Sequence, residues 1–110
     1  MIIESKIFCK LLGVRGISLY PFIFVNDKKD DVLINHEKIH YTQQVELFVI
    51  PFYFLYLKDY LKNKRLFKGD LYYRHYWSYR NIYFEKEAFE NQSNLSYLKT
   101  RERKAYNKYK

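Results

Sequence analysis

Residues 35–44 read Asn35-His36-Glu37-Lys38-Ile39-His40-Tyr41-Thr42-Gln43-Gln44 and contain the pattern H-E-x-x-H. Residues four apart on an α-helix lie one turn apart on the same face, so His36 and His40 can present imidazole nitrogens to one cation. Neutral imidazoles suit zinc, and the intervening Glu37 can take a proton from a zinc-bound water whose pKa the metal lowers to about 7. The alternative is a pair of solvated histidines on a basic helix. A metal site therefore requires that this stretch is helical and that a third ligand exists.

The residues around the motif favour a helix. The polar turn before it places Asp30 or Asp31 as an N-cap, and no glycine or proline follows until Pro51. The two histidines recur with Gln43 or Gln44 on one side of this helix. Apolar residues form another side, which can pack against a core: Val32, Leu33, Ile39, Val45 and Phe48.

With 110 residues, the chain has room for one domain, residues 1–110, with a modest core. It contains 3 glycines and 2 prolines, and no Ser/Gly-rich or Pro-rich stretch indicates a linker. The single cysteine, Cys9, has no partner for an internal disulfide and is expected to be a buried filler, which favours a reducing compartment. No apolar leader pattern precedes Gly13, so we expect a cytoplasmic protein.

Residues Ile17–Val25 are rich in β-branched and aromatic side chains. This composition predicts a strand, and Pro21 places it at a sheet edge or at a bulge because proline donates no backbone hydrogen bond. The segment Glu4–Leu12 fits either a second strand, which would complete a hairpin, or a helix. We therefore expect a mostly helical α+β fold, in which an N-terminal strand or hairpin packs on the H-E-x-x-H helix and on a second helix that carries a glutamate.

The most apolar stretch, Leu47–Leu57, would rise only about 16 Å as a helix, roughly half the thickness of the hydrocarbon core of a bilayer. It is therefore too short to span a membrane. One interpretation is a buried core helix that is kinked, or that begins anew, at Pro51. The other is partial insertion into one face of a membrane, which makes the protein peripheral and places basic side chains on the lipid head groups: Lys58, Lys62, Lys64 and Arg65.

The formal net charge of +8 favours attraction to nucleic acid, anionic lipid or acidic substrates. The basic residues are spread over two segments, Lys58–Lys68 and Lys99–Lys110, and no RNA- or DNA-binding motif accompanies them. Specific nucleic-acid binding is therefore not expected. Aromatic residues make up 21% of the chain, and most are tyrosines, which pack their rings and keep the hydroxyl hydrated. This composition suits a small domain with a thin core or one that lies against a membrane.

The third ligand is expected downstream, in a segment that Asn81 is placed to cap as a helix. A catalytic zinc site needs three protein ligands plus water, so one carboxylate completes the two histidines. Three glutamates in this segment are candidates: Glu85, Glu87 and Glu90. The alternative is that they only complement lysines on a solvated helix face.

The motif at residues 36–40, followed by Glu-x-x-Ala at residues 85–88, resembles the gluzincin metallopeptidases, a branch of the zincins. It is most similar to their minimal single-domain forms, the minigluzincins, and the resemblance covers about half of the chain. It implies His36, His40 and Glu85 as zinc ligands, Glu37 as the general base and Glu87 as a non-ligating residue. It also implies an edge strand before the first of the two helices, in the place of the predicted strand.

One position departs from this family. Many members carry an aspartate four residues after the ligand glutamate, where it holds a zinc-bound histidine by a hydrogen bond, and here the residue is Phe89. Because such partners raise metal affinity about 10- to 100-fold, we expect another side chain to replace it, with Gln44, Glu46 and Glu90 as candidates. The transition-state oxyanion also needs a partner, and four residues are candidates: Tyr79, Tyr83, Arg80 and His75.

These patterns favour a zinc-dependent metallopeptidase, with Zn2+ as cofactor and a peptide or protein substrate that aligns as an extra strand on Ile17–Val25. In the alternative, a catalytically inactive or latent zincin-like protein serves as a basic, aromatic-rich binding module on a membrane surface or, less readily, on nucleic acid. Latency would follow if the Lys99–Lys110 tail covered the cleft.

Overall fold

The computed structural model describes all 110 residues and contains six α-helices, one short 3-10 helix and a three-stranded sheet. Helices hold 62% of the residues, so the predicted mostly helical α+β fold is confirmed. In chain order the elements are β1 (Ile2–Glu4), α1 (Lys6–Leu12), β2 (Gly16–Leu19), β3 (Phe22–Val25), α2 (Asp31–Glu46), α3 (Ile50–Leu66), α4 (Leu71–Arg80), α5 (Tyr83–Asn91), α6 (Tyr97–Thr100) and the 3-10 helix η1 (Ala105–Tyr109).

The strands lie in the order β1-β3-β2, with β1 parallel and β2 antiparallel to the central β3. The prediction of one strand over Ile17–Val25 is wrong, because this segment folds into the β2–β3 hairpin, which turns at residues 20 and 21. Pro21, with its fixed φ and missing N–H, suits a turn better than a strand interior. Of the two possibilities for Glu4–Leu12, the helix is found, as α1, capped by Ser5 and closed by Gly13 in the left-handed region.

Helix α2 holds the H-E-x-x-H motif, as predicted. Its N-terminus is capped by Asp30, whose side chain accepts a hydrogen bond from the backbone N–H of Leu33 at 3.1 Å. The helix ends just before Phe48 and Val49, which adopt positive φ angles of 59° and 67°. These angles break the helical path, so α3 begins anew with Pro51 in its first turn.

The largest apolar cluster forms where α3, α5 and η1 meet, and its buried side chains are Phe52, Ile82, Tyr83, Phe84 and Tyr106. Helix α3 contributes one face to it: Phe52 is buried and Leu55 packs against the cluster, whereas Phe54 and Leu57 are exposed. The prediction that Leu47–Leu57 is a buried core helix therefore holds for one face of α3. The other face is apolar and exposed.

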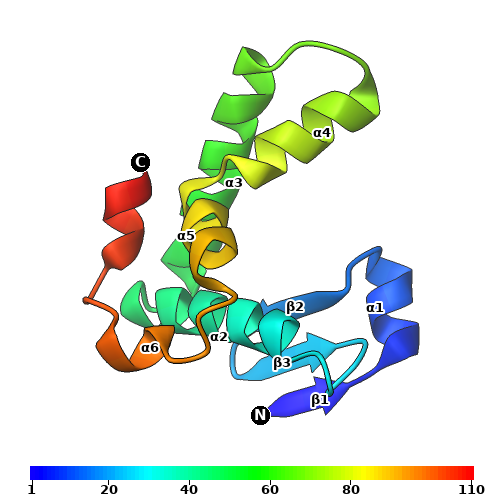
Figure 1. Cartoon of the computed structure of the whole chain (residues 1–110). Coiled ribbons are helices and arrows are strands. Elements are labelled where there is room, and N and C mark those ends of the chain that lie inside the picture. Colours follow the sequence, from blue (N-terminus) through cyan, green and yellow to red (C-terminus); the bar gives the residue numbers. More distant parts are fainter.

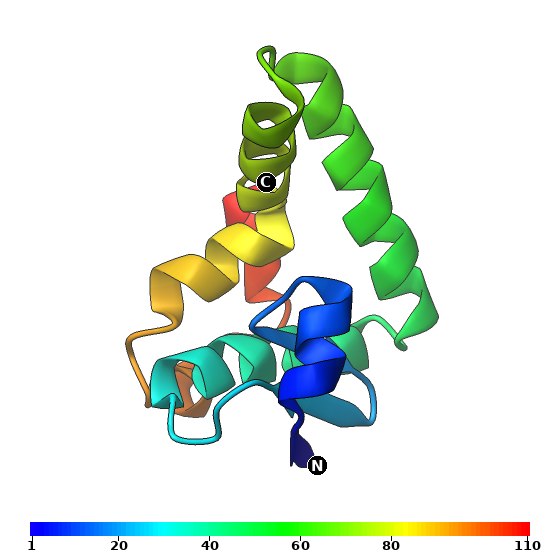
Figure 2. The same cartoon turned by 90° about the vertical axis from the view of Figure 1, so that its right-hand side faces the viewer.

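Helix α2 is the centre of the arrangement, because it contacts the sheet as well as α3 and α5 (Figure 1). Helices α3 and α4 form a hairpin that rises away from the sheet in both views (Figure 1, Figure 2). None of the helices combines the length and the apolar character needed to cross a bilayer.

The N-terminus of α5 is fixed by a neighbouring helix. Asp59 of α3 accepts a hydrogen bond from the backbone N–H of Tyr83 at 2.9 Å. Asn81, predicted as the cap of this helix, instead lies at the end of α4 and donates to the carbonyl of Trp77. The Asp59 contact places the first turn of α5, and with it Glu85, against α2 and α3.

Candidate metal centre

Three buried side chains from two helices converge on one point. His36 and His40 stand one turn apart on α2, and Glu85 comes from the first turn of α5. Glu85 Oε1 lies 3.1 Å from His36 Nε2 and 3.0 Å from His40 Nε2, and the two Nε2 atoms are 3.1 Å apart. Of the three candidate glutamates, the structure brings Glu85 to the histidines. This His-His-Glu group could bind a metal ion.

The size of the triangle of ligand atoms fits a small divalent cation. Tetrahedral ligands at about 2.0–2.1 Å from an ion lie roughly 3.3–3.4 Å from one another. The three atoms of the His-His-Glu group lie only slightly closer than this, at 3.0 to 3.1 Å. A shift of a few tenths of an ångström therefore lets one ion contact all three.

The second nitrogen of His40 is held by an amide. Its Nδ1 lies 2.8 Å from Gln43 Oε1, while Gln43 Nε2 donates to the carbonyl of Phe84 and to Glu87 Oε1. Because both of these partners only accept hydrogen bonds, the orientation of the Gln43 amide is fixed and its oxygen faces His40. Nδ1 therefore carries the proton, and the lone pair of the neutral imidazole lies on Nε2, where a metal ligand needs it.

His36 is held in the same way from the end of α5. Its Nδ1 lies 2.9 Å from Gln92 Oε1. Phe89, at the position where many gluzincins carry an aspartate, packs edge-on against the His36 ring with 4.6 Å between the ring centroids. The hydrogen-bond partner of His36 Nδ1 is therefore Gln92, three residues after Phe89. Phe89 itself holds the His36 ring by packing alone.

The residues predicted to replace the missing aspartate lie elsewhere, so that prediction is wrong. Gln44 accepts a hydrogen bond from the N–H of Tyr20 and donates to the carbonyl of Ser18, which ties α2 to β2. Glu46 pairs with the C-terminal segment, and Glu90 is exposed. The two glutamines that do contact the histidines, at positions 43 and 92, were not singled out for this role.

The carboxylate of Glu85 is itself held by a tyrosine, since Tyr56 Oη donates to Glu85 Oε2 at 2.6 Å. Burial alone would raise the pKa of Glu85, but His40 and His36 outweigh it and hold the pKa well below its usual range. Burial alone would lower the pKa of His40, and the Glu85 carboxylate reverses this and raises the pKa to about 9. A positive charge, from a proton or a metal ion, is therefore favoured at this point.

Glu37 lies between the triangle and the sheet. A Cβ atom added to Gly16 of β2 would stand 3.2 Å from Glu37 Cγ, so the strand and this side chain are in close contact. Burial raises the pKa of Glu37, although the imidazoles of His40 and His36 partly offset it. A raised pKa makes the carboxylate a better proton acceptor near neutral pH.

The His-His-Glu group borders a cleft. Its inner part, about 270 Å³, is lined by Gly16–Leu19 of β2 together with Glu37, His40 and Glu85. The outer part, about 720 Å³, reaches from the end of α1 to the α3–α4 hairpin. Both parts share walls formed by Val14, Gly16, Glu37, Tyr56 and Tyr79, so they are adjoining parts of one cleft.

The four residues predicted to stabilise the oxyanion fall into different places. Tyr79 lines both parts of the cleft, and burial together with the Glu85 charge raises its pKa, so its hydroxyl stays protonated. His75 lies at the outer wall. For the other two the prediction is wrong: Tyr83 belongs to the apolar cluster, and the guanidinium of Arg80 stacks over the Phe89 ring at 3.8 Å.

The C-terminal segment is anchored beside α5 rather than over the cleft. Arg101, whose side chain is 3% exposed, pairs with both Glu87 and Glu46. Glu87 also accepts from Gln43, so this ion-pair network is connected to the histidine site. No residue of Lys99–Lys110 lines either part of the cleft, so the alternative in which this tail covers the cleft is not what the structure shows.

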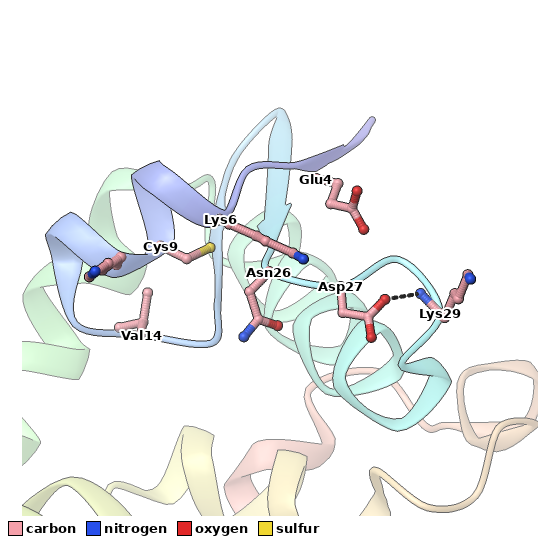
Figure 3. Close-up of a pocket in the computed structure, with 8 residues that line it drawn as sticks. Glu4, Lys6, Cys9, Val14, Asn26, Asp27 and Lys29 are labelled. Carbon is pink, nitrogen blue, oxygen red and sulfur yellow. Dashed lines mark hydrogen bonds between the residues drawn. The ribbon is translucent and has the colours of Figure 1, made fainter.

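A second hollow, about 750 Å³, lies beside α1 and the turn after β3 (Figure 3). Its walls carry charges of both signs, from Glu4, Lys6, Asp27 and Lys29, and Asp27 accepts a hydrogen bond from the backbone N–H of Lys29. Burial raises the pKa of the Cys9 thiol, which therefore stays protonated and unreactive. The predicted burial of Cys9 is confirmed, and the hollow lacks the converging ligand atoms of the His-His-Glu group.

Comparison with known proteins finds no match among family models, curated proteins or solved structures.

Proposed function

We propose that this protein is a zinc-dependent metallopeptidase. One observation supports this above all: His36, His40 and Glu85 converge within ligand distance of one another, and Glu37 lies beside them on the wall of the same cleft. Two imidazoles and one carboxylate leave one position of a tetrahedral zinc ion for water or substrate. The gluzincin resemblance implies the same ligand set in the same order along the chain.

His36, His40 and Glu85 would hold the ion, and zinc, when bound, would lower the pKa of a water molecule to about 7 and polarise the substrate carbonyl. Glu37, with its pKa raised by burial, accepts the proton of the attacking water and returns it to the nitrogen of the leaving amine. The protonated hydroxyl of Tyr79 is the donor best placed for the oxyanion, because it lies on the cleft wall beside Glu85.

The substrate backbone would pair with β2, which is an edge strand. Backbone groups of an antiparallel strand alternate between the partner strand and the free edge. The carbonyl of Arg15 accepts a hydrogen bond from the chain just after β3, so the next residue, Gly16, turns its N–H and C=O to the free edge. The outward carbonyl of Ser18 is already bonded to Gln44. The proposed pairing therefore shifts from the predicted Ile17–Val25 to Gly16, the residue just before that segment and the first of β2.

The Glu37→Gln variant tests the proposal, because it keeps the size of the side chain but removes the proton acceptor. We expect the zinc-loaded wild type to cleave unfolded protein and peptide mixtures, and Glu37→Gln to lose at least about 100-fold in rate while it still binds zinc. The control is Lys38→Gln, an exposed neighbour that should keep both properties. Equal activity of Glu37→Gln and wild type, or no cleavage of any peptide by the zinc-loaded wild type, would contradict the proposal.

A further inference from the structure

The α3–α4 hairpin, residues 50–80, presents an apolar surface that the metal centre does not use. Ile50, Phe54, Leu57 and Leu61 are spaced four, three and four residues apart, so they share one face of α3. Each of these four side chains, here called the α3 stripe, is between 48% and 70% exposed. Leu71, the first residue of α4, adds an exposed leucine at the end of the hairpin.

Helix α4 adds exposed aromatic residues, Tyr72, Tyr76 and Trp77. Tyrosine and tryptophan are enriched where a protein meets the boundary between lipid and water, because an apolar ring and a polar group lie in one side chain. The aromatic residues of α4 and the α3 stripe thus combine two kinds of side chain that a membrane interface favours.

The charges of the hairpin are almost all positive. Residues 57–80 include seven basic and two acidic residues. Both acids are engaged by the backbone: Asp59 accepts from the N–H of Tyr83, and Asp70 accepts from the N–H of Tyr73. Lysine and arginine side chains are therefore the free charges beside the leucines, and Lys58, Lys62, Arg65 and Lys68 are exposed.

The position of the hairpin lets a flat surface approach it. In both views the loop between α3 and α4 lies at the far end of the molecule from the sheet (Figure 1, Figure 2). The sheet and α1 therefore do not stand between this end of the hairpin and a planar partner.

We propose that the α3–α4 hairpin docks on the surface of an anionic lipid bilayer. The α3 stripe with Leu71 would enter the boundary region, and the basic side chains would contact the lipid phosphates. A bilayer fits better than a protein partner, because protein interfaces are depleted in lysine. It also fits better than nucleic acid, because a phosphate backbone would leave the leucines exposed. The docking surface overlaps the predicted Leu47–Leu57 at Ile50, Phe54 and Leu57 and extends beyond it to Leu61 and Leu71, whereas the other face of that segment packs into the core.

Three residues of the hairpin surface, Leu57, Tyr72 and Tyr76, also line the outer part of the cleft. A docked molecule would hold the cleft against the bilayer surface. The substrate class inferred from this position rests on the proposed peptidase activity. The substrates would be proteins whose cleaved segment lies at the surface of a membrane.

Sedimentation with vesicles tests the docking alone. We expect the protein to bind vesicles of phosphatidylcholine with phosphatidylserine, and to bind vesicles of phosphatidylcholine alone more weakly. The double variant Phe54→Gln/Leu61→Gln removes apolar contacts from two exposed positions of the α3 stripe and should lower binding to the anionic vesicles by about tenfold or more. Leu95→Gln is the matched control, because Leu95 is 57% exposed but lies on the connection after α5, and it should bind as the wild type does. Circular dichroism verifies that each variant is folded.

The docking proposal would be overturned by an absence of vesicle binding by the wild type, by equal loss in the Leu95→Gln control, or by unchanged binding in the double variant. Tighter binding to single-stranded RNA than to anionic vesicles would overturn it as well. The experiment runs in the presence of a metal chelator and uses no peptidase assay. Its failure would therefore leave the proposed activity standing, and an inactive Glu37→Gln protein is still expected to dock.

Discussion

At the scale of single residues, the orientation of His40 depends on a neutral amide rather than on a carboxylate. Replacement of Gln43 by leucine removes the Oε1 atom that accepts a hydrogen bond from His40 Nδ1. These two atoms lie 2.8 Å apart. We expect the zinc Kd to rise about 10- to 100-fold. Competition with a chromophoric chelator measures this, and Glu90→Gln, an exposed residue of α5, is the control. A Kd of Gln43→Leu within twofold of wild type would show that this contact does not orient the ligand.

Tyr79 in the last turn of α4 and Tyr83 at the start of α5 allow a hydroxyl in the cleft to be compared with one in the core. Tyr79 lines both parts of the cleft, whereas Tyr83 packs in the apolar cluster. Tyr79→Phe should lower kcat by about 10- to 100-fold with little change in zinc affinity, because it removes a donor to the oxyanion. Tyr83→Phe should keep kcat. Steady-state kinetics with one peptide compare the two, and equal effects would argue against a catalytic hydroxyl at Tyr79.

The residues that the sequence identified at this scale are those with a spacing rule. His36 and His40 follow from the helical period, and Glu85 was one of three glutamates that the sequence left open and that the fold now separates. Gln43 and Gln92 were missed as partners of the histidines because neutral amides bind histidine in no fixed pattern along a chain. Tyr56 was missed because its contact to Glu85 spans 29 residues and depends on how α3 and α5 pack.

At the scale of elements, the close contact of β2 with α2 depends on Gly16. A Cβ atom there would stand 3.2 Å from Glu37 Cγ and 3.2 Å from Leu33 Cδ1. Gly16→Val should therefore lower the free energy of unfolding by about 1–3 kcal/mol and raise KM, because the strand must move away from the helix. Ser18→Ala on the same strand is the control, since its buried hydroxyl has no partner and its loss should leave stability unchanged or slightly higher. Urea unfolding measures both, and a Gly16→Val protein as stable as wild type would contradict the contact.

Apolar patterning predicted where secondary structure would form more reliably than where it would turn. The segment Ile17–Val25 has the composition of a strand throughout, and the one feature that divides it, Pro21, allows an edge position, a bulge or a turn. Helix α3 shows the same limit. Its apolar residues surround the helix, so periodicity alone could not reveal that Phe52 packs inward while Phe54 stays exposed.

At the scale of the whole molecule, the C-terminal segment stabilises the fold through Arg101. Its guanidinium pairs with Glu87 and Glu46, and Arg101 and Glu87 are almost fully buried. Arg101→Met should lower the free energy of unfolding by about 3–5 kcal/mol, because it leaves carboxylates uncompensated. The double variant Arg101→Met/Glu87→Gln should recover part of this loss, because it removes one of the unpaired charges. Thermal and urea unfolding measure both proteins, and additive losses would show that the two residues are not coupled.

The shifted pKa values of His40 and Glu85 predict how the stability of the metal-free protein varies with pH. The pKa of His40 is raised to about 9, so its contribution is complete below an unfolded pKa of about 6.5 and is lost as the pH rises toward 9. The pKa of Glu85 is lowered, so its contribution is present above about 4.5 and is lost as the pH falls. Metal-free stability should therefore peak between about pH 4.5 and 6.5.

Zinc needs neutral imidazoles, so the rise in Tm on adding zinc should grow from pH 6 toward pH 9. Scans with chelator and with zinc test this, and a metal-free Tm that keeps rising to pH 9 would contradict it.

We propose that two histidines of α2 and one glutamate of α5 hold a single metal ion. Elemental analysis of protein purified with zinc and freed of loosely bound metal tests it most directly, on wild type, Glu37→Gln, His40→Ala and Glu85→Ala, each verified as folded by circular dichroism. We predict close to one zinc per chain in wild type and in Glu37→Gln, and loss of the metal in the two ligand variants. Negligible zinc in the wild type, or the same zinc content in all four proteins, would contradict the account.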